Sequence, residues 1–261
     1  MMHAVDTTPV LLIRGLMREQ RHWGEFKPLL QAALPNPVLS LDFAGCGELF
    51  QQRSPCHISA LRQSVRQQLL VEPQFSGRVH LLAISLGGML ALNWALSYPQ
   101  EVASLTLINS SARPLSPFYR RLNWRNYPRI VRSLFASAVQ REQMILALTS
   151  NNTAKHSVVL SDWLCWQQLC PVSSTNALRQ LWAASRFEIT AKPQCPLLFI
   201  SSVQDRLVSP QCSVDLARHW QAHHIQHPWA GHDLPLDDAP WLVQRYQQQL
   251  RSFDSAERRF N

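Results

Sequence analysis

Short apolar runs alternate along this chain with longer stretches in which apolar residues recur every three or four positions. The runs predict buried strands and the spacing predicts amphipathic helices. We expect strands at residues 9–13, 38–41, 79–83, 102–108 and 196–201, and a short polar strand at residues 224–227. We expect helices at residues 19–34, 58–71, 86–97, 211–221 and 240–253. This alternation predicts an α/β fold with a mostly parallel sheet of about six strands flanked by helices.

The alternation stops after Asn109, where about 80 residues show helical spacing without a clear strand. We therefore predict a core domain made of residues 1–111 and 191–261, with a helical segment, residues 112–190, inserted into it. The chain length of 261 residues is enough for one such domain with a sizeable core.

The centre of the pattern is a strand, a tight turn and a helix that meet at Ser85. Its neighbours two positions away, Ala83 and Gly87, are both small. Small residues there let a strand and a helix pass closely on either side of a strained turn. The stretch resembles the nucleophile elbow of the α/β-hydrolases, G-x-S-x-G, with Ala83 at the first glycine position. Taken alone, the same residues also fit an ordinary turn between a strand and a helix.

Two further motifs resemble the same family and follow in its chain order of serine, acid and histidine. Asp205 comes after the strand at 196–201 and begins a D-x-x-V-x-P loop. His232 comes after the strand at 224–227, in a Gly-His pair. Active groups of an open α/β sheet gather at the carboxyl ends of its strands. The resemblance thus implies a Ser85, His232 and Asp205 triad, whereas each residue alone could be structural.

The resemblance also implies two backbone N–H donors that bind an oxyanion. One donor would be Leu86, directly after the nucleophile, and the other Leu16, in the loop after the first strand. That loop carries Arg14 where the family often has histidine. Arg14 either takes a structural hydrogen-bonding role or faces the pocket and binds a substrate anion.

The inserted segment occupies the place where this family carries its lid, and it holds most of the chain's excess charge. Residues 112–190 contain ten Lys and Arg and three acids, within a chain of formal net charge +8. If the segment were one helix, four of its arginines would share a face: Arg121, Arg125, Arg129 and Arg132. Such a face is either solvated or binds an acidic partner. Its large aromatic residues predict a lid core or an acyl pocket: Trp124, Tyr127, Phe135, Trp163, Trp166 and Trp182.

The chain is similar to the esterases that cleave pimeloyl-acyl-carrier-protein methyl ester, in size, in its Ser-Leu-Gly-Gly elbow and in its basic helical lid. This similarity implies a serine esterase, with an acyl carrier protein or another anionic acyl donor as the partner of Arg121, Arg125, Arg129, Arg132 and Trp124. Three alternatives stay open. They are a thioesterase, a carbon–carbon bond hydrolase or lyase, and a non-catalytic binding protein of the same fold.

The sequence lacks the motifs that are typical of several other function classes. The sequence has no phosphate-binding loop, no dinucleotide-binding glycine pattern and no cluster of metal ligands, so we expect neither a cofactor nor a metal. No apolar stretch is long enough to span a membrane, and the basic segment carries no known nucleic-acid-binding motif. The six cysteines form no C-x-x-C pair, and the first residues lack a signal-peptide pattern, so we expect a cytoplasmic protein.

Overall fold

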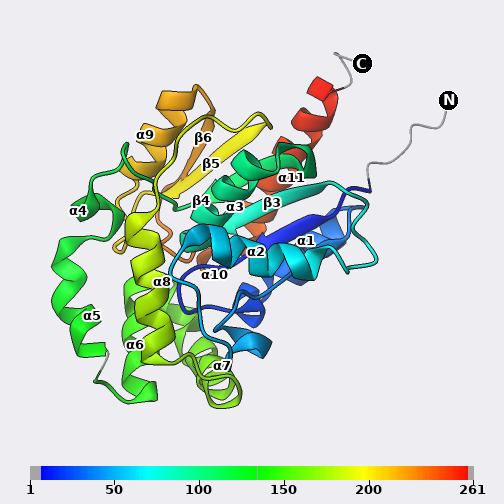
Figure 1. Cartoon of the computed structure of the whole chain (residues 1–261). Helices are drawn as coiled ribbons and strands as arrows, with labels where there is room; N and C mark the ends of the chain where they lie inside the picture. The colour runs from blue at the N-terminus through cyan, green and yellow to red at the C-terminus, as the bar shows by residue number, and fades with distance from the viewer. Residues whose placement is uncertain (1–6, 134, 258–261) are drawn as a thin grey trace.

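The computed structural model describes residues 7–133 and 135–257, and its centre is one parallel sheet. The strand order is β2-β1-β3-β4-β5-β6 (Figure 1). The strands are β1 (Val10–Ile13), β2 (Val38–Ser40), β3 (Val79–Ile84), β4 (Val102–Ile108), β5 (Leu197–Ser202) and β6 (His223–His227). All six predicted strands are confirmed. The central strands are mostly apolar because helices cover both of their faces, whereas the edge strand β6 is mostly polar and only partly buried.

Helices cover both faces of the sheet. The α-helices are α1 (Phe26–Ala33), α2 (Ile58–Leu69), α3 (Leu86–Ser97), α4 (Phe118–Arg121), α5 (Tyr127–Ser133), α6 (Ala138–Thr149), α7 (His156–Leu169), α8 (Ser174–Arg186), α9 (Gln211–Trp220), α10 (Leu234–Asp237) and α11 (Ala239–Glu257). Short 3-10 helices are η1 (Gln20–Trp23), η2 (Gly47–Leu49), η3 (Pro99–Glu101), η4 (Trp124–Asn126) and η5 (Thr153–Lys155).

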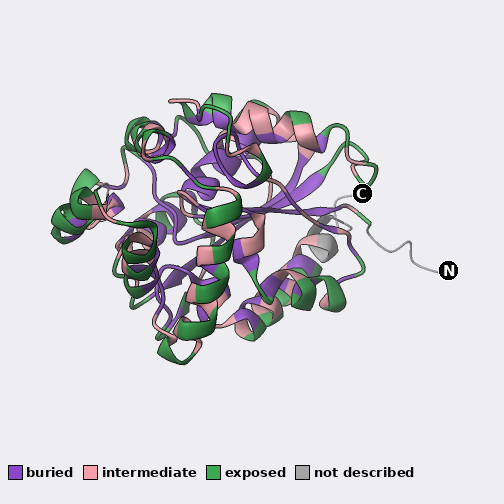
Figure 2. Ribbon diagram, turned by 90° about the horizontal axis from the view of Figure 1, so that it is seen from below, coloured by how far each residue is buried: buried purple, intermediate pink, exposed green. Residues whose placement is uncertain are grey.

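Alternate residues of each strand enter two separate cores. On β3, Leu81 and Ala83 pack with α2, α3 and α9, whereas Leu82 and Ile84 pack with α1 and α11. Figure 2 shows the buried strands between helices whose outer faces are exposed. The sheet is therefore fixed on both sides, and the carboxyl ends of its strands form a rigid edge for side chains.

The predicted helix at residues 19–34 is interrupted. Residues 20–23 form η1, and α1 begins only at Phe26. The break lies at Gly24, whose φ of 50° takes the chain out of the helical region. The apolar spacing continued across this break and did not reveal it.

In the described parts of the chain, the α-helices α4 to α8 lie between β4 and β5. Their two ends meet at the base, where Arg113 and Glu188 form an isolated parallel bridge and Ile189 N donates to Arg113 O at 2.9 Å. Apart from this bridge, the described residues of 112–190 form no strand. Figure 1 shows α5 and α6 beyond one side of the sheet, far from α11. We refer to residues 112–190 as the inserted segment.

In the part of the chain that the structure describes, no helix combines the length and the apolar composition needed to cross a bilayer.

Candidate active site

Ser85 lies at the turn between β3 and α3 in a backbone conformation that is rare for a side-chain-bearing residue. Its φ is 56° and its ψ is −119°, and its N–H donates to Ile108 O at 2.9 Å. Neighbouring backbone presses against the turn, because a Cβ added to Gly87 would lie 2.4 Å from Arg14 O. A Cβ on Gly15 would lie 3.2 Å from Ser85 Cβ. Strain held by close packing is characteristic of functional turns.

Asp205 and His232 are brought together from the loops that follow β5 and β6. Asp205 Oδ2 lies 2.7 Å from His232 Nδ1, and both side chains are buried. The other carboxylate oxygen accepts the N–H groups of Leu207 at 2.8 Å and Val208 at 2.9 Å. The carboxylate is thus held by its own loop and can fix the tautomer of the imidazole, leaving Nε2 free to accept a proton.

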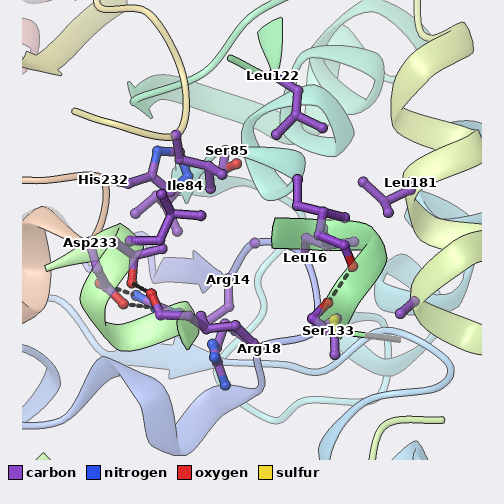
Figure 3. A pocket seen from close by; sticks show the side chains of 18 residues that line it. Arg14, Leu16, Arg18, Ile84, Ser85, Leu122, Ser133, Leu181, His232 and Asp233 are labelled. Carbon is purple, nitrogen blue, oxygen red and sulfur yellow. Dashed lines mark hydrogen bonds and ion pairs between the residues drawn. The ribbon is translucent and has the colours of Figure 1, made fainter. Parts of the chain in front are cut away.

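Ser85 and His232 line one cavity of about 130 Å³, which we call the inner cavity (Figure 3). Among the described residues, no hydrogen bond joins the serine hydroxyl to this imidazole. Such bonds are often long in an empty site and shorten when substrate binds. The serine, the imidazole and the carboxylate therefore occupy one site, in the chain order expected from the sequence.

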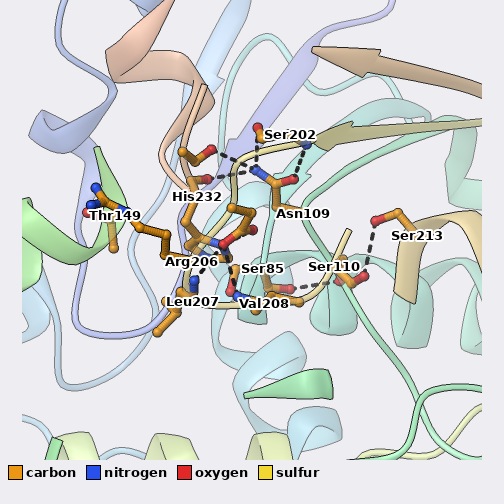
Figure 4. A network of polar contacts seen from close by, with 12 residues as sticks. Ser85, Asn109, Ser110, Thr149, Ser202, Arg206, Leu207, Val208, Ser213 and His232 are labelled. Atoms are coloured by element: carbon orange, nitrogen blue, oxygen red, sulfur yellow. Dashed lines mark hydrogen bonds and ion pairs between the residues drawn. The ribbon is translucent and has the colours of Figure 1, made fainter. Parts of the chain in front are cut away.

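A polar network behind the site links three strand ends (Figure 4). Asn109, at the end of β4, donates from Nδ2 to His232 O at 2.8 Å, and its Oδ1 accepts Ser202 N at 2.8 Å. The next residue, Ser110, donates from Oγ to Ser85 O at 2.9 Å. Neither Asn109 nor Ser110 was among the predicted site residues. The sequence feature that could have indicated them is the polar run Asn-Ser-Ser directly after a buried strand.

The N–H groups of Leu16 and Leu86 both lie at this site. Leu86 is the first residue of α3, and Leu16 follows Gly15 beside Ser85. In the described chain neither N–H donates to a protein acceptor. Gln180, from α8, holds the Leu16 loop by accepting the N–H of Met17 at 3.0 Å. No pattern in the sequence indicates this contact between the loop and the inserted segment.

Arg14 is paired inside the protein, so its predicted role as a binder of substrate anions needs correction. Its guanidinium makes two hydrogen bonds to the Asp233 carboxylate, Nη1 to Oδ1 at 3.0 Å and Nη2 to Oδ2 at 2.5 Å. Burial raises the pKa of Asp233, but the attraction of Arg14 outweighs it and leaves that pKa below its ordinary value. The charge of Arg14 is therefore already neutralised, which agrees with the structural alternative.

The four arginines of the inserted segment do not share one helical face. Arg121 ends α4 and is buried, with Nη2 donating to Ala184 O at 2.6 Å, and burial lowers its pKa to about 10. Arg125 lies on η4, whereas Arg129 and Arg132 lie on α5. The helix breaks because α5 restarts at Tyr127, just before Pro128, which is favoured in a first helical turn. Arg125, Arg129 and Arg132 are exposed, whereas Arg121 is buried and lines a cavity beside Ser85.

The predicted aromatic core of this segment is only partly present. Trp163 is buried, but Trp124 is 58% exposed and Phe135 is 87% exposed. Trp182 and Tyr127 line a second cavity of about 410 Å³ beside Ser85, which we call the outer cavity. Trp124 lines neither cavity in the described structure, and the Arg125 guanidinium lies 5.8 Å from its ring centre.

Comparison with known proteins agrees with this architecture. The family described as "Alpha/beta hydrolase family" matches residues 10–245. The chain belongs to the α/β-hydrolase family. One curated relative is a protein of Klebsiella pneumoniae (strain 342) named "Putative carbamate hydrolase RutD". It is 27% identical over 241 residues, which cover 88% of this chain and 86% of the relative.

Two solved structures show the same fold at low identity. An esterase from Thermogutta terrifontis has a TM-score of 0.75 and 20% identity, covering 94% of this chain and 90% of the other. The enol-lactonase from Burkholderia xenovorans LB400 has a TM-score of 0.71 and 17% identity, covering 97% of this chain and 93% of the other. The chain is therefore a family member with hydrolases among its relatives, while its substrate must be inferred from the site.

Proposed function

We propose that this α/β-hydrolase cleaves carboxylic esters with Ser85 as nucleophile, His232 as general base and acid, and Asp205 as the residue that orients the imidazole. The observation that carries the proposal is the 2.7 Å contact between Asp205 and His232, with the imidazole and Ser85 lining one cavity. A serine hydroxyl is a weak nucleophile and needs a base that a third group orients.

The reaction has two halves. His232 takes the Ser85 proton while Oγ attacks the carbonyl carbon, and the N–H groups of Leu16 and Leu86 bind the resulting oxyanion. His232 then protonates the departing alcohol, leaving an acyl group on Ser85. In the second half His232 activates water, which releases the acid and restores the serine.

Steady-state hydrolysis of phenyl acetate tests this assignment. Ser85→Ala removes the nucleophile, so turnover should fall to the rate without enzyme while circular dichroism stays that of the parent. The matched control is Ser97→Ala, which removes an exposed hydroxyl at the far end of the helix that Ser85 precedes and should keep the turnover of the parent. Unchanged turnover in the Ser85→Ala protein would overturn the proposal, whereas a correctly folded parent without turnover would favour a non-catalytic binding protein of this fold.

A second candidate is carbamate hydrolysis, favoured by the relatives named for that activity, whose similarity extends over most of the chain. A carbamate carbonyl would use the same serine and oxyanion donors. Comparing kcat/KM for phenyl acetate and phenyl N-methylcarbamate distinguishes the two. A higher value for the carbamate would replace the ester assignment. For a carbon–carbon bond hydrolase, the support expected from Arg14 is weakened by its pairing with Asp233.

We further propose that the exposed arginines of the inserted segment, Arg125, Arg129 and Arg132, dock an anionic acyl donor such as an acyl carrier protein. They lie in a stretch without any acid, from Arg113 to Arg141, close to the outer cavity lined by Tyr127. Attraction between opposite surface charges mainly accelerates encounter.

Charge reversal tests this docking. Arg125→Glu should raise KM for a carrier-bound ester severalfold and leave KM for a small neutral ester unchanged, with a stronger effect at low salt. Arg251→Glu is the control, since Arg251 is an exposed arginine on α11, on the far side of the molecule from α5 (Figure 1). Equal effects of Arg125→Glu on both substrates would argue against docking.

A further inference from the structure

Two cavities of unequal size meet at Ser85. The inner cavity has a volume of about 130 Å³ and the outer cavity about 410 Å³. Ser85, Leu16 and Leu122 line both, so the serine lies at their junction. An ester bound at Ser85 can therefore extend one half into each cavity, and the difference in volume limits the two halves differently.

His232 decides which half enters which cavity. Of the described residues, His232 lines the inner cavity and is not among those lining the outer one. The alcohol oxygen must lie against the imidazole, because the imidazole gives this oxygen the proton that it took from Ser85. The alcohol half therefore extends into the inner cavity. The acyl half extends into the outer cavity, which is lined by Leu86, one of the two residues whose N–H groups bind the oxyanion.

The inner cavity is small, and its lining, as far as the structure describes it, carries no uncompensated charge. An engineered apolar cavity of about 150 Å³ holds a benzene molecule, so about 130 Å³ accepts an alcohol of roughly six carbons or fewer. The two guanidiniums near its wall are each paired with a buried carboxylate, Arg14 with Asp233 and Arg18 with Glu142 at 2.8 Å. A neutral, compact alcohol fits this surrounding, and an anionic one does not.

The outer cavity is suited to a longer group. Its volume is about three times larger, and its lining includes Trp182 and Phe118, which are 54% and 71% exposed. Its wall therefore reaches the surface, and a chain bound there can extend beyond the protein. The inner cavity is instead roofed by buried residues of the inserted segment such as Leu148 and Ala177.

We infer that the enzyme selects esters of small uncharged alcohols with longer acyl groups, an inference that rests on the ester hydrolysis proposed above. Ser85 Oγ bonds to the acyl carbon, the bond from that carbon to the alcohol oxygen breaks, and His232 passes the serine proton to the alcohol. The alcohol leaves, and one water takes its place beside His232. The water oxygen bonds to the acyl carbon, the bond to Ser85 breaks, and the water's proton returns through His232 to the serine.

Two ester series on the unaltered enzyme test the inference. Hexanoate esters of methanol, ethanol, butanol and octanol should lose at least tenfold in kcat/KM between butyl and octyl. Methyl esters of acetate, butyrate, hexanoate and decanoate should keep or gain kcat/KM as the acyl chain grows. The opposite asymmetry, or equal tolerance in both series, would overturn it.

A matched pair of substitutions on α8 assigns each limit to its cavity. Ala177→Leu fills the inner cavity and should lower the alcohol limit towards methyl. Ala184→Leu fills the outer cavity and should shorten the accepted acyl chain. If each variant changed the other series instead, the assignment of the halves would be wrong. The series on the unaltered enzyme decides even if a variant fails to fold.

Failure of this inference is distinguishable from failure of the proposed function. Turnover that depends on Ser85 but shows no alcohol limit rejects only the size selection. Turnover that survives Ser85→Ala, or none with any ester in either series, rejects the ester hydrolase and the selection with it.

Discussion

The buried pair of Arg14 and Asp233 gives a stability prediction whose size follows from its geometry. The side chains are 4% and 5% exposed and joined by two hydrogen bonds. Asp233→Asn keeps the shape but leaves the guanidinium as an uncompensated buried charge. Removing one partner of such a pair typically costs about 3–5 kcal/mol of unfolding free energy. For a chain of 261 residues this corresponds to a decrease of about 5–10 °C in Tm.

The assay is urea unfolding followed by tryptophan fluorescence, with thermal scans in parallel. The control is Glu25→Gln, which breaks the ion pair of Glu25 with Lys155, whose side chains are 51% and 36% exposed. Exposed pairs contribute about 0–1 kcal/mol, so this variant should stay close to the parent. If Asp233→Asn lost no more stability than Glu25→Gln, the buried pair would not hold the Arg14 loop as we argue.

The same pair predicts a pH dependence. The pKa of Asp233 is lowered in the folded protein, so its stabilising contribution is present above the ordinary carboxyl pKa and is lost as pH falls through the folded value. The difference in unfolding free energy between the parent and Asp233→Asn should therefore be largest near neutral pH. It should shrink as pH falls below about 4. A difference that grew on acidification would contradict this sign.

Three further outcomes follow from single contacts. Asp205→Asn should lower kcat/KM by about 10³- to 10⁴-fold in an ester assay with little change in Tm, because the imidazole loses its orienting carboxylate; a loss under tenfold would contradict that role. Gly87→Ala places a Cβ 2.4 Å from Arg14 O, so circular dichroism and activity should show a destabilised, inactive elbow, and parent-like activity would refute the packing argument. Burial raises the pKa of the Cys46 thiol to about 12, so a thiol reagent at pH 8 should modify the exposed Cys165 and spare Cys46, as mass spectrometry would report. Equal modification of both would contradict the burial.

Strand positions and strand-end chemistry could be predicted from the sequence because both are local. The strands before Ser85 and Asp205 are mostly apolar runs and the strand before His232 is short and polar, and each of the three residues directly follows its strand or lies a few residues beyond it. Parallel topology then places these ends at one edge. The grouping of the three residues could therefore be predicted from their positions in the chain alone.

Contacts between distant segments could not be predicted this way. Nothing near Arg14 in the sequence indicates its partner, which lies 219 positions away. Nor does anything near Met17 indicate that the amide of Gln180 holds its loop. The arginines from Arg121 to Arg132 do have helical spacing in the sequence, but the helix is interrupted between α4 and α5. Packing then decides which of these arginines is buried.

The most direct test of the central claim is to find which residue reacts as a nucleophile. The protein is incubated with a fluorophosphonate, digested, and its peptides are mapped by mass spectrometry, beside the Ser85→Ala protein. We predict one adduct, on Ser85, that forms faster in the parent than in Asp205→Asn and is absent from Ser85→Ala. An adduct on another residue, or a parent protein that stays unmodified while correctly folded, would contradict the account.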